Sequence, residues 1–182
     1  MKAERFTIIA IRHGETEWNR IGKAQNQLDS PLTMKGKRQM HNVGRYLATQ
    51  KSLTLNAIYT SQLGRAISSA KIIARYLKVP VISQMELSEF DSEQQRRTMA
   101  IQWIQRVSRH HNNENPILLL GHGDWIKTLA SLGTPKQIED RRDGVFTYYY
   151  ESSELLVALT FHNGVLLFKE QAKNDGRYEF VR

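Results

Sequence analysis

Apolar residues follow two different spacings along this chain. Short continuous runs, which are typical of buried strands, alternate with longer stretches in which apolar residues recur every three or four positions, as in an amphipathic helix. The runs cover residues 6–11, 57–60, 79–82 and 116–120. The helical stretches cover residues 33–49, 62–77, 92–110 and 124–132. Thr33 is a suitable N-cap for the first helix, and the run that ends at Gly121 is apolar throughout, as in a strand buried on both faces.

The end of the chain has a different pattern. Strands are favoured at residues 145–150, 155–161 and 165–168. Asn163-Gly164 is a strong signal for a two-residue hairpin turn. Strands that alternate with helices pair in parallel and are covered by helices on both faces. The pattern therefore predicts an α/β fold: a three-layer sandwich with a mostly parallel central sheet, helices on both faces and a C-terminal antiparallel hairpin.

The composition is that of one folded domain. The 182 residues suffice for a single core, and 40% hydrophobic and 24% charged residues are ordinary for a globular protein. No stretch resembles a linker, so residues 1–182 are expected to form a single domain. The absence of cysteine excludes disulfides and thiolate chemistry and favours a cytoplasmic location. No apolar run is long enough to span a bilayer, so no membrane partner is expected.

The formal net charge of +8 favours anionic partners such as phosphorylated substrates, nucleic acid or acidic membrane surfaces. The basic residues are scattered, with short pairs at Arg96-Arg97 and Arg141-Arg142. A nucleic-acid-binding arm would carry a dense basic block, so we expect no nucleic-acid partner. The adjacent His110 and His111 point apart on a helix and have no carboxylate at ligand spacing, so no metal site is expected.

Two histidines lie where strands are predicted to end. Arg12 and His13 follow the first strand, and His122 lies between two glycines after the strand at 116–120. Open parallel sheets carry their functional loops beyond the carboxyl ends of their strands. Alone, a histidine or an arginine at such a place is more often structural than catalytic. Together, the two segments predict that both imidazoles meet in one cleft.

The cleft would combine two guanidinium groups with two imidazoles, from Arg12, His13, Arg65 and His122. This set suits a phosphoryl group, because guanidinium groups make permanently charged, forked contacts to phosphate oxygens. A neutral imidazole can attack phosphorus and be displaced later by water. Neighbouring arginines disfavour protonation of His13 and so favour its nucleophilic form. The reaction also needs a carboxylic acid to protonate the leaving oxygen.

Four segments resemble, in the same order, the motifs of the histidine phosphatase superfamily, which includes the cofactor-dependent phosphoglycerate mutases and many small phosphatases. They are Ile11-Arg12-His13-Gly14-Glu15-Thr16-Glu17-Trp18-Asn19, Asp29-Ser30-Pro31-Leu32-Thr33 with Gly36, Ile58-Tyr59-Thr60-Ser61 with Leu63, Arg65 and Ala66, and Gly121-His122-Gly123. The resemblance implies a phosphatase that hydrolyses phosphate monoesters through a phosphohistidine intermediate, with no metal and no cofactor. Its substrates would be phosphorylated small molecules or phosphoproteins.

The resemblance also implies roles for individual residues. The nucleophile would be His13, and catalysis would also involve Glu89 and His122. The phosphate pocket would be formed by Arg12, Asn19, Arg65, His122 and Gly123. Glu15 and Glu17 would orient the loop that follows the nucleophile.

The assignment of the proton donor rests on a shorter motif. Leu87-Ser88-Glu89 resembles the family's L-x-E segment, which nominates Glu89, but the glycine and the tryptophan-glutamate-glycine pattern that usually follow it are absent. The sequence leaves other carboxylates open for the same role. These are Glu86, Asp91, Glu93 and Asp124.

Two further departures from the family concern loops. Asn26 replaces the glycine of a pair that small phosphatases often carry, and asparagine tolerates the positive φ of such a turn. The capping insertion, at about residues 86–115, is shortened because one helix and one strand fill most of it. An open pocket would admit water and broad or bulky substrates, which favours hydrolysis. A phosphoglycerate mutase-type phosphotransferase and a catalytically weak phospho-ligand-binding relative are the alternatives, and the oligomeric state stays open.

Overall fold

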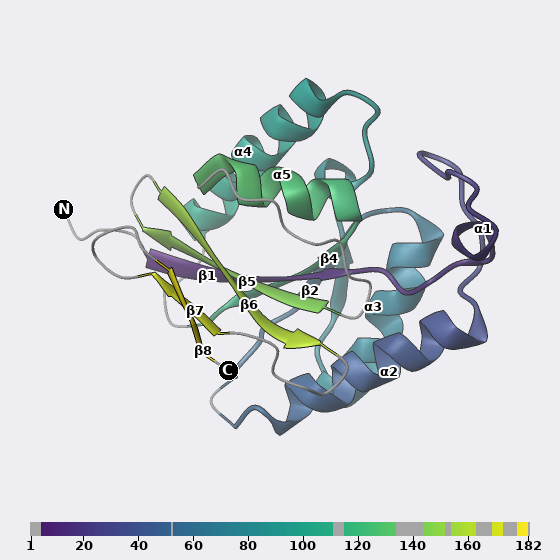
Figure 1. The fold of residues 1–182 in the computed structure, drawn as a ribbon, viewed down its shortest axis with the longest axis horizontal. Helices are drawn as coiled ribbons and strands as arrows, with labels where there is room; N and C mark the ends of the chain where they lie inside the picture. The colour runs from purple at the N-terminus through teal and green to yellow at the C-terminus, as the bar shows by residue number, and fades with distance from the viewer. Residues whose placement is uncertain are drawn as a thin grey trace.

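The computed structural model describes residues 5–51, 53–110, 115–133, 144–151, 154–162, 169–172 and 178–181. Its centre is a six-stranded sheet with the order β3-β2-β4-β1-β5-β6 (Figure 1). The strands are β1 (Arg5–Arg12), β2 (Ile58–Thr60), β3 (Val81–Ser83), β4 (Ile117–Gly121), β5 (Gly144–Glu151) and β6 (Glu154–His162). The first four strands in this order pair in parallel, whereas β5 is antiparallel to both β1 and β6. The predicted mostly parallel sheet is confirmed.

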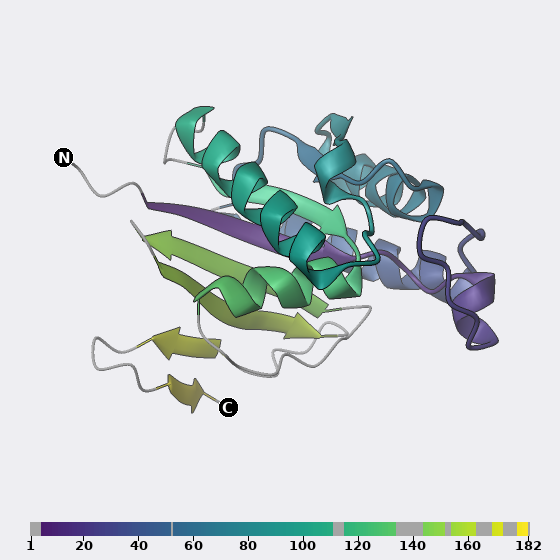
Figure 2. The same cartoon turned by 90° about the horizontal axis from the view of Figure 1, so that it is seen from above.

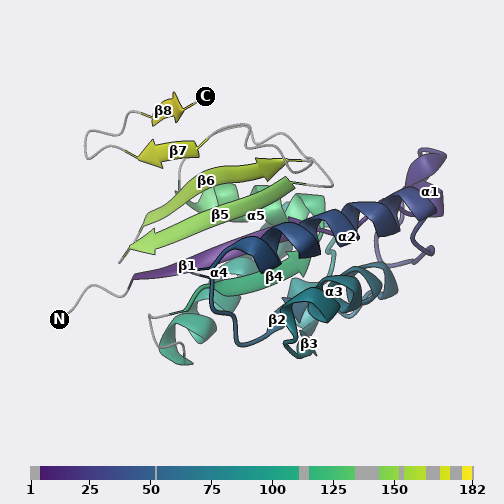
Figure 3. The ribbon, with the colours of Figure 1, turned by 90° about the horizontal axis from the view of Figure 1, so that it is seen from below.

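Helices cover both faces of this sheet (Figures 1, 2 and 3). They are α2 (Met34–Thr49) and α3 (Gly64–Leu77) on one face, and α4 (Glu93–His110) and α5 (Gly123–Gly133) on the other. Successive side chains of a strand point to opposite faces, so β1 contributes to both layers. Its Ile9 and Ile11 pack under α2 and α3, whereas Ile8 and Ala10 pack under α4 and α5. The three-layer sandwich expected from the sequence is confirmed.

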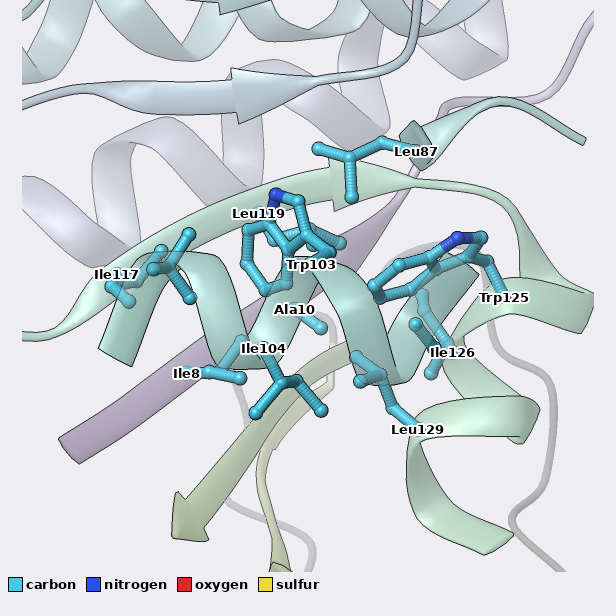
Figure 4. Packing of buried hydrophobic residues seen from close by; sticks show 12 residues of the cluster. Ile8, Ala10, Leu87, Trp103, Ile104, Ile117, Leu119, Trp125, Ile126 and Leu129 are labelled. Atoms are coloured by element: carbon cyan, nitrogen blue, oxygen red, sulfur yellow. The ribbon is translucent and has the colours of Figure 1, made fainter. Parts of the chain in front are cut away.

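Two tryptophans anchor α4 and α5 on the sheet (Figure 4). The fully buried rings of Trp103 and Trp125 meet edge to face, with centroids 5.6 Å apart. The Trp103 Nε1–H donates to the side-chain oxygen of Gln84 (2.6 Å), and the Trp125 Nε1–H donates to the backbone carbonyl of Glu86 (3.0 Å). These bonds hold the short 3-10 helix at Met85–Leu87 against both helices. The turn leads directly into the loop that carries the nominated acid.

The bounds of the helices agree with the predicted ranges to within two residues. Thr33 caps α2 as predicted, because its hydroxyl oxygen accepts the N–H of Gly36 (2.9 Å). The sequence pattern missed α1 (Glu17–Arg20) and the 3-10 helix, because a single turn is too short to show a repeat. None of the helices in the described ranges is both long and apolar enough to cross a membrane.

The carboxyl-terminal part also holds a separate antiparallel pair, β7 (Lys169–Ala172) and β8 (Tyr178–Val181), which the sequence pattern missed. The predicted strand at residues 165–168 and the predicted turn at Asn163-Gly164 lie outside the described residues.

Candidate active site

Strands β1 and β4 bring the two predicted histidines together. These strands are parallel neighbours in which Arg12 pairs with Gly121, and the backbone N–H of His13 donates to the Gly121 carbonyl (2.9 Å). The rings of His13 and His122 lie side by side, with centroids 5.4 Å apart and planes at 61°. Both side chains are buried. The two imidazoles therefore share one site at the carboxyl end of the parallel strands.

The backbone around His13 fixes the ring and its tautomer. The Nδ1–H of His13 donates to the Gly14 carbonyl (2.8 Å), and because a carbonyl oxygen only accepts, the neutral ring carries its lone pair on Nε2. The Gly14 N–H in turn donates to the Ser69 hydroxyl oxygen (3.1 Å) on α3. Gly14 also lies so close to α2 that a Cβ there would be 2.5 Å from the Gly36 carbonyl oxygen. Two helices thus hold the loop that positions Nε2.

The Arg65 guanidinium is buried and mostly occupied by protein acceptors. Its Nη1 donates to the Leu28 carbonyl (2.6 Å) and to the Asp29 carboxylate (3.1 Å). Its Nη2 donates to the Asn26 carbonyl (2.8 Å) and to the Glu89 carboxylate (2.6 Å). Four of the five guanidinium N–H groups are thereby used, and the buried Nε–H has no acceptor among the described residues. An anion therefore meets one open donor, with Nη2 as a second if Glu89 moves away.

Asp29 holds both the backbone and the side chain of Arg65. Besides the guanidinium, its carboxylate accepts the backbone N–H groups of Gly64 and Arg65, the latter at 3.1 Å. These are the first N–H groups of α3, and the N-cap residue Leu63 makes no side-chain cap of its own. Asp29 thus caps α3 from a distant loop, a role that the sequence did not assign. The same loop contains Asn26, whose φ of 46° confirms the predicted positive-φ turn.

Glu89 lies against the positively charged side of the site. Burial raises the pKa of its carboxyl group, and the Asp124 carboxylate raises that pKa further, against the opposing effects of Arg65 and Arg12. Protonated Glu89 is therefore more populated near neutral pH than an ordinary carboxylic acid would be. It contacts Arg65 directly, in the ion pair described above.

The other four nominated carboxylates have different surroundings. Glu86 pairs with Arg106, and the hydrogen bond from that guanidinium lowers the pKa of the Glu86 carboxyl group. Asp91 and Glu93 are exposed near the start of α4. Asp124 lies in the first turn of α5 and is about half exposed. Within the described part of the chain, no group of three or more histidines and carboxylates could hold a metal ion.

His122 is a buried and uncharged imidazole. Its pKa lies well below the ordinary value of 6.5, chiefly because of burial, with further lowering by the nearby charges of His13, Arg65 and Arg12. Its Nε2 shares a hydrogen bond of 2.7 Å with the Ser61 hydroxyl, which the sequence did not nominate. Gly123 follows as the first residue of α5, so its backbone N–H belongs to a helix N-terminus, where anions bind favourably.

Asn19 helps to cap the start of the short helix α1, which follows the nucleophile. Its carboxamide oxygen accepts the backbone N–H (3.2 Å) and the hydroxyl (2.9 Å) of Thr16, in a capping box around α1. Both hydrogen bonds of this oxygen therefore come from Thr16. The NH2 group is the part of Asn19 that can donate to a phosphoryl oxygen.

Glu15 and Glu17 contact the loop and its neighbours. The Glu15 carboxylate accepts the Thr33 hydroxyl (3.0 Å) and pairs with Lys35 (3.1 Å), which connects the loop to the start of α2. Glu17 pairs with Arg20 on the same turn of helix (2.9 Å). The contacts of Glu15 agree with an orienting role, whereas the exposed pair of Glu17 and Arg20 stays within one turn of α1.

Sequence comparison shows which family residues 8–96 resemble. Residues 8–96 match the sequence model of the histidine phosphatase superfamily (branch 1). This segment of the chain is similar to the histidine phosphatase superfamily. Over 84 residues, or 46% of the chain, it is 38% identical to "Uncharacterized phosphatase PhoE" of Bacillus subtilis, covering 42% of that protein. Over a stretch of the same length it is 43% identical to "Probable phosphoglycerate mutase GpmB" of Klebsiella pneumoniae, covering 38% of it. The histidine phosphatase segment thus aligns with about two fifths of the length of these curated relatives.

Solved structures share the fold over most of the chain. The chain superposes on YhfR of Bacillus stearothermophilus with a TM-score of 0.72 at 22% identity, covering 88% of this chain and 100% of that one. It superposes on the alpha-ribazole phosphatase of Shigella flexneri with a TM-score of 0.73 at 18% identity, covering 88% and 98%. At these identities the likeness establishes the fold alone, and not a family or a substrate.

Proposed function

We propose that this chain hydrolyses phosphate monoesters through a phosphohistidine formed on Nε2 of His13, without a metal ion or cofactor. The observation that carries the proposal is the hydrogen bond from Nδ1 of His13 to the Gly14 carbonyl, because it directs the lone pair to Nε2 in a buried site. The charges of Arg12 and Arg65 act on that site, as their effects on the pKa of His122 indicate. Such fixed cationic groups stabilise the charge of a phosphoryl group in the transition state.

The reaction would proceed in two displacements. In the first, Nε2 of His13 attacks phosphorus, the bond from phosphorus to the ester oxygen breaks, and protonated Glu89 gives its proton to that oxygen, which leaves as an alcohol. In the second, the Glu89 carboxylate takes a proton from water while the water oxygen attacks phosphorus. The phosphorus–nitrogen bond then breaks, inorganic phosphate leaves, and His13 and Glu89 return to their starting forms.

Two observations favour hydrolysis over phosphoryl transfer between substrates. Only residues 90–92 lie between Glu89 and α4, and α4 packs on the sheet through Trp103 and its neighbours. This short segment supports the proposal that the capping insertion at about residues 86–115 is shortened and leaves the site open. Relatives and structural neighbours carry phosphatase names, such as PhoE and alpha-ribazole phosphatase. The mutase name of other relatives keeps a phosphoglycerate mutase-type transferase as the second candidate.

The substrates would be phosphorylated small molecules or phosphoproteins. The site would belong to a single domain that comprises residues 1–182. A phosphomonoester presents a dianion. The predicted pocket would bind this dianion through hydrogen-bond donors of Arg12, Asn19, Arg65, His122 and Gly123. The proposal fits the charge of the whole chain, whose net +8 attracts such anions.

The role of Glu89 separates an enzyme from a weak phospho-ligand-binding relative. We expect Glu89→Gln to lower kcat/KM for an alkyl phosphate by about 10²- to 10⁴-fold, because a poor leaving group needs a proton from the enzyme. The loss should be much smaller for an activated aryl phosphate, whose leaving group departs without help. Glu93→Gln, at an exposed position of the same segment, is the matched control and should leave both rates unchanged. Equal, small losses on both esters in Glu89→Gln would remove Glu89 from the role.

A further inference from the structure

The hydroxyl of Ser61 has two hydrogen-bond partners among the described residues. Its oxygen lies 2.7 Å from Nε2 of His122 and accepts the backbone N–H of Leu63 (3.2 Å). Ser61 and His122 are both fully buried, so water does not compete for these bonds. The second ring nitrogen of His122, Nδ1, is buried as well and has no hydrogen-bond partner among the described residues.

These contacts favour one tautomer of His122. A serine hydroxyl has one proton and two lone pairs, and the Leu63 N–H uses one lone pair. If the hydroxyl donates to Nε2, the ring proton is on Nδ1, and the Nδ1–H is the one group left without a partner. If Nε2 donates instead, the hydroxyl proton and the Nδ1 lone pair are both left without partners. An unsatisfied buried polar group costs about 1–3 kcal/mol, so the first arrangement is preferred.

We infer that Ser61 is a positioning residue that holds His122 with its proton on Nδ1, so that this imidazole presents an N–H to the phosphoryl group. The inference rests on the proposed function for its ligand. A lone pair on Nδ1 would repel phosphoryl oxygens, whereas an N–H donates to them. The buried Nδ1–H then has the acceptor that the described protein groups do not supply.

The same tautomer gives the two neighbouring histidines opposite tasks. In His13 the Nδ1–H is bound by the Gly14 carbonyl, and the ring offers the lone pair of Nε2. In His122 the Nε2 lone pair is bound by Ser61, and the ring offers the Nδ1–H. Phosphorus would accordingly be attacked by one ring, while the other donates to a phosphoryl oxygen. The hydrogen-bond partner of each ring, the Gly14 carbonyl or the Ser61 hydroxyl, therefore decides whether the ring attacks phosphorus or donates to a phosphoryl oxygen.

The tautomer matters because His122 is uncharged. Burial is the main cause that keeps its pKa well below the ordinary value, the charges of Arg65 and Arg12 lower this pKa further, and His13 adds to the effect whenever it is protonated. A protonated imidazole would donate from both nitrogens and would need no positioning. A neutral imidazole donates from one nitrogen only, so a residue that selects the nitrogen also selects the donor.

Nitrogen NMR on the native protein tests the assignment without turnover. In protein labelled with ¹⁵N-histidine, and with the signals assigned through a His122→Gln variant, we expect Nδ1 of His122 to show the shift of a protonated nitrogen and Nε2 that of an unprotonated acceptor. A proton on Nε2 would overturn the inference. An inactive protein with the proton on Nδ1 would refute the proposed function and support the role of Ser61. An active protein with the proton on Nε2 would support the proposed function and refute the role of Ser61.

Variants of Ser61 test the consequence for phosphate recognition. Orthovanadate is the probe, because it resembles the phosphoryl group. We expect Ser61→Ala to weaken vanadate inhibition by about tenfold, the effect of losing one well-placed hydrogen bond, and Ser61→Thr, which keeps the hydroxyl, to restore most of it. The matched control is Thr60→Val, since the buried Thr60 hydroxyl on the same strand has no partner among the described residues. Native vanadate affinity in Ser61→Ala would overturn the inference.

Discussion

At the scale of single residues, the chemistry of the site depends on the hydrogen-bond partner of each side chain. His13 and His122 could be nominated from the sequence, because each follows an apolar run at a predicted strand end. Ser61 could not be assigned its role in this way. Its contact with His122 requires β2 and β4 to be neighbours with Thr60 opposite Leu120, and a local pattern of apolar residues does not fix which strands are adjacent.

Arg65 shows a second limit of sequence reasoning. The motif nominates its guanidinium as a forked phosphate ligand, but four of its N–H groups are bound by a loop 36 to 39 residues earlier in the chain and by Glu89. Only the tertiary structure reveals that Nε is the open donor. The role of Arg65 as a phosphate ligand stays a prediction, and the structure reduces the number of its N–H groups that an anion can use.

The buried, neutral state of His122 predicts a pH dependence of stability. Its pKa in the folded protein is well below the ordinary value of 6.5. Between those two values the unfolded chain binds a proton on this imidazole and the folded protein does not, so the free energy of unfolding falls as the pH is lowered below about 6.5. One such group contributes a slope of up to about 1.4 kcal/mol per pH unit.

Urea denaturation between pH 7 and pH 5 checks this prediction. The His122→Gln variant should show a smaller slope of unfolding free energy against pH than the native protein. The same slope in both proteins would mean that His122 does not carry the effect.

At the scale of elements, the loop before α2 and the start of α3 form one unit. The helix patterns were readable from the sequence, since apolar stripes at three- and four-residue steps predict α2 and α3. The cap of α3 was not readable, because Leu63 at the N-cap position carries no suitable side chain and the carboxylate comes from Asp29, in a different segment. The unit joins the stability of a helix to the position of Arg65, the arginine that is predicted to bind phosphate.

Removal of the Asp29 carboxylate should therefore affect stability and activity together. We expect Asp29→Ala to lower the free energy of unfolding by about 1–2 kcal/mol, the usual effect of losing a cap. It should also lower kcat/KM by about tenfold or more, because a displaced guanidinium no longer meets the phosphoryl group. Thermal denaturation and hydrolysis of an aryl phosphate measure the two effects.

Asp91→Asn is the matched control for this variant. Asp91 is exposed, and its side chain makes none of the described hydrogen bonds, so neither quantity should change. A stable Asp29→Ala protein with native activity would contradict the link between the cap and Arg65.

At the scale of the whole molecule, only residues 90–92 separate Glu89 from α4, which is a helix of the sandwich. Alternating runs and stripes predicted the α/β class and both helical layers. The strand order could not be predicted by the same means, because it depends on long crossovers between strands that are far apart in sequence. The structure adds that α4 is a layer of the sandwich, since Trp103, Ile104 and Val107 belong to its core.

This architecture predicts a tolerant pocket. A closely fitting pocket distinguishes substrates by about 10- to 200-fold for a single methylene group, whereas an open one does not. We expect kcat/KM to vary by less than about tenfold between small and bulky phosphomonoesters with leaving groups of equal acidity. A panel of phosphorylated metabolites and phosphopeptides measures the range, and a preference of several hundredfold for one member would indicate a closed pocket.

The proposed mechanism requires a covalent phosphoenzyme on His13, so detection of this intermediate is the decisive experiment. Native protein quenched during turnover of a ³²P-labelled monoester should retain a phosphoryl group that is labile in acid and stable in base, as expected for phosphohistidine. His13→Ala should retain none, and His41→Ala, a histidine on α2 bonded to Tyr76, should retain the native amount. A phosphoryl group of the same kind that persists in His13→Ala would contradict the account.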